Sequence, residues 1–147
     1  MKTKKFSNIK KVGLLAFLAI IIVLPFTSCS RKMTFLNSSV VPAAQGSVKV
    51  KQDRNKNYVI KVEVRDLADV SRLQPPKKTY VVWMETDQGK TENLGQLLSS
   101  TSFMSNQMKG SLETVSSFNP AKIYITAEND AGIQYPGRQI VLSTARF

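Results

Sequence analysis

Apolar and polar residues alternate along most of the chain from Ser47 onward, and a period of two is typical of β-strands with one buried face. The alternation is clearest in residues 58–64 (YVIKVEV) and 122–128 (KIYITAE). Turn-forming residues separate such runs, as in residues 87–90 (DQGK). No stretch shows three turns of an amphipathic helix. About seven short strands at spacings of roughly 8–15 residues predict an all-β fold, an immunoglobulin-like β-sandwich of antiparallel strands over residues 47–147.

The most apolar of the expected strands is residues 79–85 (TYVVWME), which contains the only Trp of the chain. Because alternate side chains of a strand point to opposite faces, Tyr80 and Trp83 cannot both face the core. We expect Trp83 to be the one that lies between the two sheets. A domain of this length buries enough surface to fold without a disulfide.

Two residue counts exclude several classes of site. The 147 residues include no His and one Cys. A chain with this composition cannot form a His-based catalytic triad, a Cys–His dyad or a CxxC redox pair. Zinc sites built from Cys and His, and internal disulfides, are excluded on the same grounds.

The N-terminal residues are organised like a secretory leader. Residues 1–11 are short and cationic, residues 12–26 (VGLLAFLAIIIVLPF) are almost wholly apolar, and the small residues Thr27 and Ser28 follow. A charged start, an apolar stretch of about 7–15 residues and a small-residue cleavage site define a signal peptide. The apolar stretch is shorter than the roughly 20 residues that a spanning helix needs. We therefore assign residues 1–28 to a signal peptide.

The junction after this leader resembles the bacterial lipobox, in which a Cys becomes the lipid-modified first residue of the mature protein. The matching residues are Phe26-Thr27-Ser28-Cys29, with Phe where Leu is commoner. The resemblance implies two or three acyl chains on Cys29, which anchor a protein stably, whereas one chain gives only marginal binding. Residues 30–46 are polar with a few apolar positions and contain Pro and Ser, so we expect residues 29–46 to be the acylated Cys and a flexible tether.

The net charge of +11 divides unequally between leader and mature chain. Residues 1–28 contain five Lys and no acid, and the remainder contains 16 Lys and Arg against 10 Asp and Glu. Clustered cations would indicate nucleic-acid binding, but those of the mature chain are scattered along the sequence. We expect a solvated cationic surface and no nucleic-acid partner.

Four short patches resemble the extracytoplasmic C-terminal domain of anti-sigma factors of the regulator-of-sigma-K type. The resemblance covers about residues 47–145 and implies a β-sandwich with a sensing or docking role. It does not imply anti-sigma activity, because nothing here matches the zinc-binding cytoplasmic domain of that family, and no functional residue carries over. The patches are Tyr80-Val81-Val82-Trp83, Leu94-Gly95-Gln96-Leu97, Ile125-Thr126-Ala127-Glu128, and Pro136-Gly137 with Ile140-Val141-Leu142.

Few residues suggest chemistry. Glu85, Asp87 and Glu92 surround an expected hairpin turn, and paired carboxylates can hydrolyse glycosides or bind Ca²⁺. We expect solvated hairpin charges instead, and the same of the cluster 128–130 (END). Tyr135, beside Pro136-Gly137 in an expected loop, is the aromatic side chain best placed to contact a ligand.

Three functions remain open at this point. The most consistent is a non-enzymatic envelope lipoprotein that faces the periplasm, with membrane lipid as a partner through acylated Cys29. Its sandwich would dock an unidentified envelope protein or serve a structural or sensing role, without a cofactor or metal. The alternative is a carbohydrate- or peptidoglycan-binding module with a groove around Tyr135 and the loop 99–107. An enzyme has no supporting set of residues.

Overall fold

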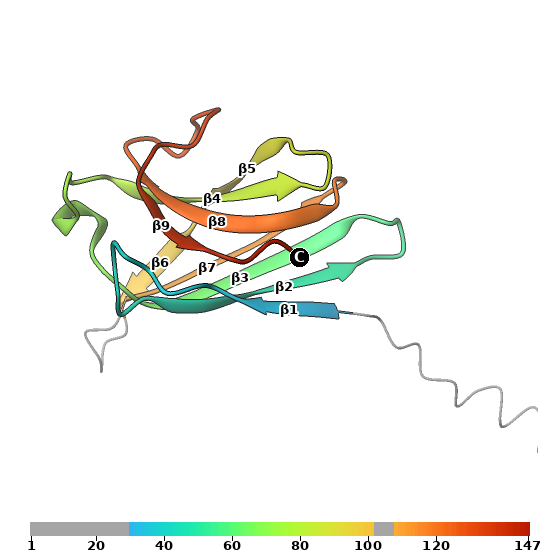
Figure 1. Ribbon diagram of the computed structural model, residues 1–147, viewed down its shortest axis with the longest axis horizontal. Coiled ribbons are helices and arrows are strands. Elements are labelled where there is room, and N and C mark those ends of the chain that lie inside the picture. The colour runs from blue at the N-terminus through green and yellow to red at the C-terminus, as the bar shows by residue number, and fades with distance from the viewer. Residues whose placement is uncertain (1–29, 102–107) are drawn as a thin grey trace, which may run out of the picture.

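The computed structural model describes residues 30–101 and 108–147. These residues form two antiparallel sheets that pack face to face, which confirms the predicted β-sandwich (Figure 1). The described part of the chain has nine strands where about seven were expected, because β1 and β6 were not foreseen. The elements are β1 (Ser30–Thr34), β2 (Gln45–Gln52), β3 (Tyr58–Leu67), the 3-10 helix η1 (Val70–Arg72), β4 (Thr79–Thr86), β5 (Thr91–Gln96), β6 (Leu98–Thr101), β7 (Met108–Ser116), β8 (Pro120–Glu128) and β9 (Ile140–Ser143).

The order of strands within the sheets is that of an immunoglobulin-like fold. One sheet has the order β1-β2-β3-β7-β6 and the other has the order β5-β4-β8-β9. In immunoglobulin nomenclature, β2-β3-β7-β6 correspond to strands A-B-E-D, and β5-β4-β8-β9 correspond to C′-C-F-G. Strand β1 extends the first sheet beyond β2 and forms its edge.

The segment 30–46 is part of the fold, which corrects the expectation of a flexible tether there. Strand β1 pairs with β2 along its whole length. Val41 and Ala44, which follow it, are buried in the core. The hydroxyl of Ser38 accepts a hydrogen bond from the backbone N–H of Val41 and donates one to the carbonyl oxygen of Val141 in β9. The first residue that the structure describes, Ser30, is therefore already part of the sheet.

The core lies between the sheets and is built from alternate residues of the central strands. The inward residues of β8 are one of its two alternating sets, Ile123, Ile125 and Ala127. Ile60, Val62 and Val64 of β3 face them from the other sheet and are almost completely buried. Burying a branched aliphatic side chain contributes about 1.5–3 kcal/mol, so these central strands supply much of the stability.

The inward residue of β4 is Tyr80 rather than Trp83. Tyr80 is buried in the core between the sheets, and its hydroxyl donates a hydrogen bond to the carbonyl oxygen of Ala68 at 2.9 Å. Trp83 is also fully buried, but in a second cluster with Val81 and Tyr124 on the outer face of the four-stranded sheet. The alternation correctly placed Tyr80 and Trp83 on opposite faces, but the prediction that Trp83 lies between the sheets was wrong.

Tyr80 makes stability depend on pH in the alkaline range. Burial, aided by the negative charge of Asp69, raises the pKa of Tyr80 to about 12. Because the unfolded chain loses this proton near pH 10, the contribution of Tyr80 is complete below pH 10 and is lost as the pH rises through 12. We expect Tyr80→Phe to cost about 1 kcal/mol at pH 8, through the lost hydrogen bond, and this deficit to shrink toward pH 12. Urea unfolding of both proteins at several pH values measures it, and parallel pH profiles would contradict it.

Candidate functional site

The outer face of the four-stranded sheet is covered by the loop that connects β8 to β9. Val81, Trp83 and Tyr124 form the buried floor, and Ala131 and Ile133 of the loop pack on them. The indole N–H of Trp83 donates a hydrogen bond to the hydroxyl of Thr126 at 2.8 Å. This explains how an outward-facing Trp is fully buried with its polar atom satisfied.

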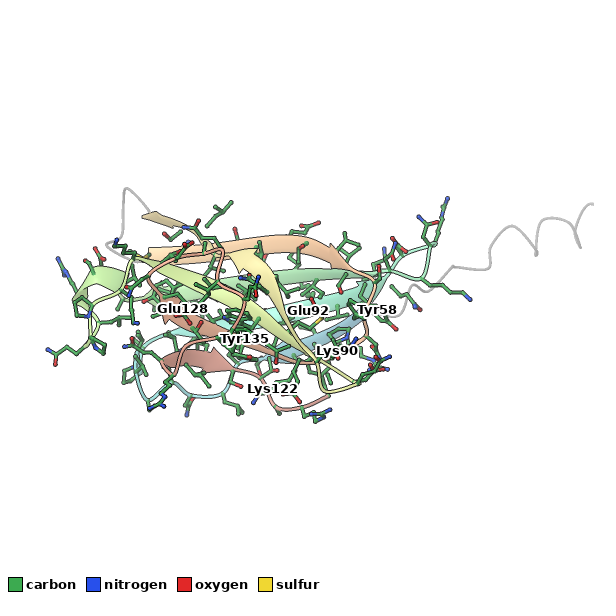
Figure 2. All side chains as sticks on the ribbon, turned by 90° about the horizontal axis from the view of Figure 1, so that it is seen from above. Tyr58, Lys90, Glu92, Lys122, Glu128 and Tyr135 are labelled. Carbon is green, nitrogen blue, oxygen red and sulfur yellow. The ribbon has the colours of Figure 1, made fainter. Side chains whose placement is uncertain are left out.

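Hydrogen bonds hold this loop at both ends. The side-chain amide of Asn93 in β5 donates to the carbonyl oxygens of Ala131 and Ile133, at 2.9 and 2.8 Å. Beyond the tip, the backbone N–H of Gly137 donates to a carboxylate oxygen of Glu128 at 2.7 Å. Tyr135 lies between these two attachments and is 81% exposed, as expected for a loop aromatic. In the view of Figure 2, Tyr135 lies between Glu128 and Glu92.

Glu128 is a buried structural carboxylate, which corrects the expectation of a solvated hairpin charge. Only 5% of the residue is exposed. A Cβ atom on Gly137 would lie 2.6 Å from one of the Glu128 oxygens, so the loop needs glycine at that position to approach the carboxylate. Asp130, two residues later, is exposed and accepts a hydrogen bond from the backbone N–H of Gly132, as in a local turn. The three residues 128–130 therefore do not act as one acidic cluster.

The carboxylates around the β4–β5 hairpin are not brought together as a pair. Glu85 forms an ion pair with Arg146 near the C-terminus, and Asp87 accepts a hydrogen bond from the side chain of Asn119. Glu92 is opposite Met84 in the hairpin, so Glu85 and Glu92 lie at alternate positions, on opposite faces of the sheet. Among the residues that the structure describes, no group of three or more Asp, Glu, Cys or His residues could hold a metal ion.

Six cations lie at outward positions of the five-stranded sheet, although they are scattered along the sequence. Lys32 of β1 is directly opposite Lys49 of β2, which is opposite Lys61 of β3, so three lysines form one row across the sheet. The regular outward positions carry two carboxylates, and Asp66, in the bulge of β3, lies 3.9 Å from Arg65 as a third. Lys61 hydrogen-bonds Glu63, and this contact, with smaller effects of Lys49 and Lys32, lowers the pKa of the Glu63 carboxyl. We call this surface the lysine face; its charged residues are Lys32, Lys49, Lys51, Lys61, Arg65 and Lys109 with Glu63 and Glu113.

A groove of about 840 Å³ opens on the lysine face. Its lining includes three cations, Lys32, Arg65 and Lys109, one carboxylate, Glu63, and the hydroxyl residues Thr34, Ser47 and Ser111. A second groove of about 960 Å³ lies at one end of the sandwich, and Arg72 and Arg138 contribute to its wall. Tyr135 lines neither of these two grooves.

Two of the expected features fall outside the described residues. Cys29 and the leader 1–28 precede the first described residue, and most of the loop 99–107 lies in the undescribed range 102–107. Within the described part, no helix is both long and apolar enough to cross a membrane. The lipidation of Cys29 and a ligand groove beside that loop stay predictions.

The four sequence patches that resemble the anti-sigma-factor domain gather in one part of the molecule. They occupy β4, β5, β8 and β9 with the β8–β9 loop, so the resemblance concerns the four-stranded sheet and its cover. It remains a prediction, because a comparison of the chain with protein-family models, with curated proteins and with solved structures finds no match.

Proposed function

We propose that this chain is a lipoprotein of the bacterial cell envelope, anchored through acylated Cys29, with a periplasmic β-sandwich that docks another envelope protein and catalyses no reaction. One observation carries the anchor: Cys29 is the only Cys of the whole chain, and it stands between an apolar leader and the first strand of the sheet. A thiol at that junction supplies the nucleophile that lipidation needs. The resemblance to an extracytoplasmic sensing or docking domain supports the same role for the sandwich.

The β8–β9 loop is the surface on which docking is best supported. Tyr side chains are enriched among the residues that dominate binding energy at protein interfaces. Tyr135 is largely exposed on a loop that Asn93 and Glu128 hold in place. A loop that is already ordered loses little conformational entropy when a partner binds, so more of its contact energy is available as affinity.

Cross-linking from position 135 tests this docking surface. We expect a photoreactive phenylalanine analogue at Tyr135 to give a discrete cross-linked band in living cells, and Tyr135→Ala to reduce recovery of the same protein at least tenfold. This is the loss expected for an interface residue worth more than about 1.4 kcal/mol.

The matched control places the same analogue at Phe118, which is 40% exposed. Phe118 lies just before the first residue of β8, whereas the β8–β9 loop follows the last residue of that strand. A band from position 135 alone supports docking through the β8–β9 loop. The same band from both positions, or from neither, would contradict this surface.

A further inference from the structure

The position of β1 fixes how far the sandwich can move away from an anchor at Cys29. Ser30, the next residue, is the first residue of β1, so no spacer separates Cys29 from the sheet. Three residues of extended chain span at most about 11 Å, so the backbone of Lys32 stays within that distance of Cys29. Lys51 is directly opposite Ser30 on β2. Two members of the lysine face therefore lie close to the point where acyl chains would enter the bilayer.

The arrangement of charges on this face is unfavourable for the isolated domain. Like charges directly opposite one another on adjacent strands destabilise a sheet, and Lys32, Lys49 and Lys61 form such a row. Glu63 and Glu113, with Asp66 beside Arg65, offset three of the six cations, which leaves a net charge of +3 on the face. The outward strand positions of the other sheet carry one exposed pair of opposite charges, Glu85 and Lys122, and the buried Glu128, so they hold no excess of cations. An anionic surface would neutralise the lysine face and not the opposite one.

We infer that the lysine face rests on the anionic phospholipid headgroups of the membrane that holds Cys29, an inference that depends on the proposed acylation. Basic residues near a bilayer are attracted to anionic lipids over about one Debye length, and the short connection keeps them within or near that range. The groove adds a specific element. Lys32, Arg65 and Lys109 with the hydroxyls of Thr34, Ser47 and Ser111 supply donors for a headgroup phosphate, and the one carboxylate of the lining, Glu63, is already paired with Lys61 at 3.1 Å.

This orientation places the two surfaces of the sandwich in different roles. The outer faces of the two sheets lie on opposite sides of the molecule (Figure 1). With the lysine face against the membrane, the β8–β9 loop and Tyr135 point away from it, toward the periplasm. The membrane contact then orients the docking surface, because a single acylated residue does not by itself fix how the domain is turned.

Lysine reactivity in vesicles tests the orientation. The acylated protein, isolated from cells, is reconstituted in phosphatidylcholine vesicles and in phosphatidylcholine vesicles that also contain phosphatidylglycerol, and is treated with an amine-reactive reagent. Mass spectrometry then gives the labelling of each lysine. We expect Lys49, Lys51 and Lys109 to be protected at least fivefold by the anionic lipid, Lys90 in the β4–β5 turn to be unchanged, and about 1 M salt to remove the protection.

A pair of variants with equal loss of charge isolates the effect of the face. Two lysines at an anionic surface change a docking equilibrium by about 30-fold, so Lys32→Gln/Lys49→Gln should abolish the protection of Lys109. Lys77→Gln/Lys78→Gln, in the loop before β4, should leave that protection intact. Equal labelling in both kinds of vesicle, with acyl chains present on Cys29, would overturn the orientation and leave the anchor standing. Absence of acyl chains from the Cys29 peptide would instead overturn the proposed anchor, and the orientation with it.

Discussion

Replacing Trp83 by alanine is expected to lower the free energy of unfolding by about 3–5 kcal/mol, which is the usual cost of truncating a fully buried aromatic side chain. Trp83 is completely buried, although it faces away from the main core. Its loss removes the floor on which Ala131 and Ile133 pack, and it leaves the Thr126 hydroxyl without its donor. For a domain of this size, the midpoint of thermal unfolding should fall by about 10–20 °C.

The prediction distinguishes a structural cover from a loop that merely lies over the sheet. Circular dichroism gives the unfolding midpoint, because the variant no longer contains a Trp for fluorescence. Amide hydrogen exchange of residues 129–139 should become faster in Trp83→Ala, since their packing surface is lost. Val115→Ala, at an outward side chain that is 58% exposed, is the control and should change the unfolding free energy by less than about 0.5 kcal/mol. A loss below about 1 kcal/mol for Trp83→Ala would mean that the loop does not depend on this cluster.

The sequence alone was sufficient to predict the strands in which apolar and polar residues alternate. Strands β3 and β8 were predicted correctly from residues 58–64 and 122–128, because the alternation is local to each strand. Strands β1 and β6 were missed since their sequences, SRKMT and LSST, contain a single apolar residue each. Each is an edge strand that depends on pairing with one neighbour, β2 or β7, and such pairing leaves no local pattern.

The orientation of β4 could not be deduced from its own sequence. All but one of its eight residues are buried, so both faces are apolar and alternation says only which residues share a face. The decision between Tyr80 and Trp83 depends on the β8–β9 loop, which covers the face that would otherwise be exposed to solvent. Burial of Glu128 has the same origin, because its partner Gly137 belongs to that loop.

The lysine face likewise could not be predicted from the sequence of any one strand. Each of the four strands that carry the six cations contributes only one or two of them, so inspection of any single segment finds an ordinary polar face. Alternation does place Lys49 and Lys61 outward on their strands. Only the strand register shows that they are directly opposite one another and opposite Lys32. Tyr135, by contrast, was identified from its loop context alone and is exposed as expected.

Substituting Cys29 by alanine should abolish lipid attachment completely, because the chain has no other thiol. We expect the wild-type protein grown with a labelled fatty acid to carry the label, and its mature form to begin at an acylated Cys29. Cys29→Ala should carry no label and should accumulate with residues 1–28 still attached, since cleavage at a lipobox follows modification of the Cys. The measurement is labelled-lipid incorporation together with the intact mass of the protein.

Two variants at the preceding residue make this result specific to the junction. Ser28→Ala keeps a small side chain before the Cys and should be acylated and cleaved like the wild type, whereas Ser28→Leu should block cleavage, because bulk at that position does not fit a small-residue cleavage site.

Two or three acyl chains, at about 0.8 kcal/mol per buried CH₂, should also keep the mature wild-type protein on membranes through a high-salt wash that releases electrostatic contacts. Label retained by Cys29→Ala would assign the lipid to another residue, and an unmodified Cys29 in the wild type would refute the anchor. Because the described strands begin at Ser30, the substitution changes none of their residues. The variant should therefore unfold at the same temperature as the wild type, so a loss of anchoring cannot be attributed to misfolding.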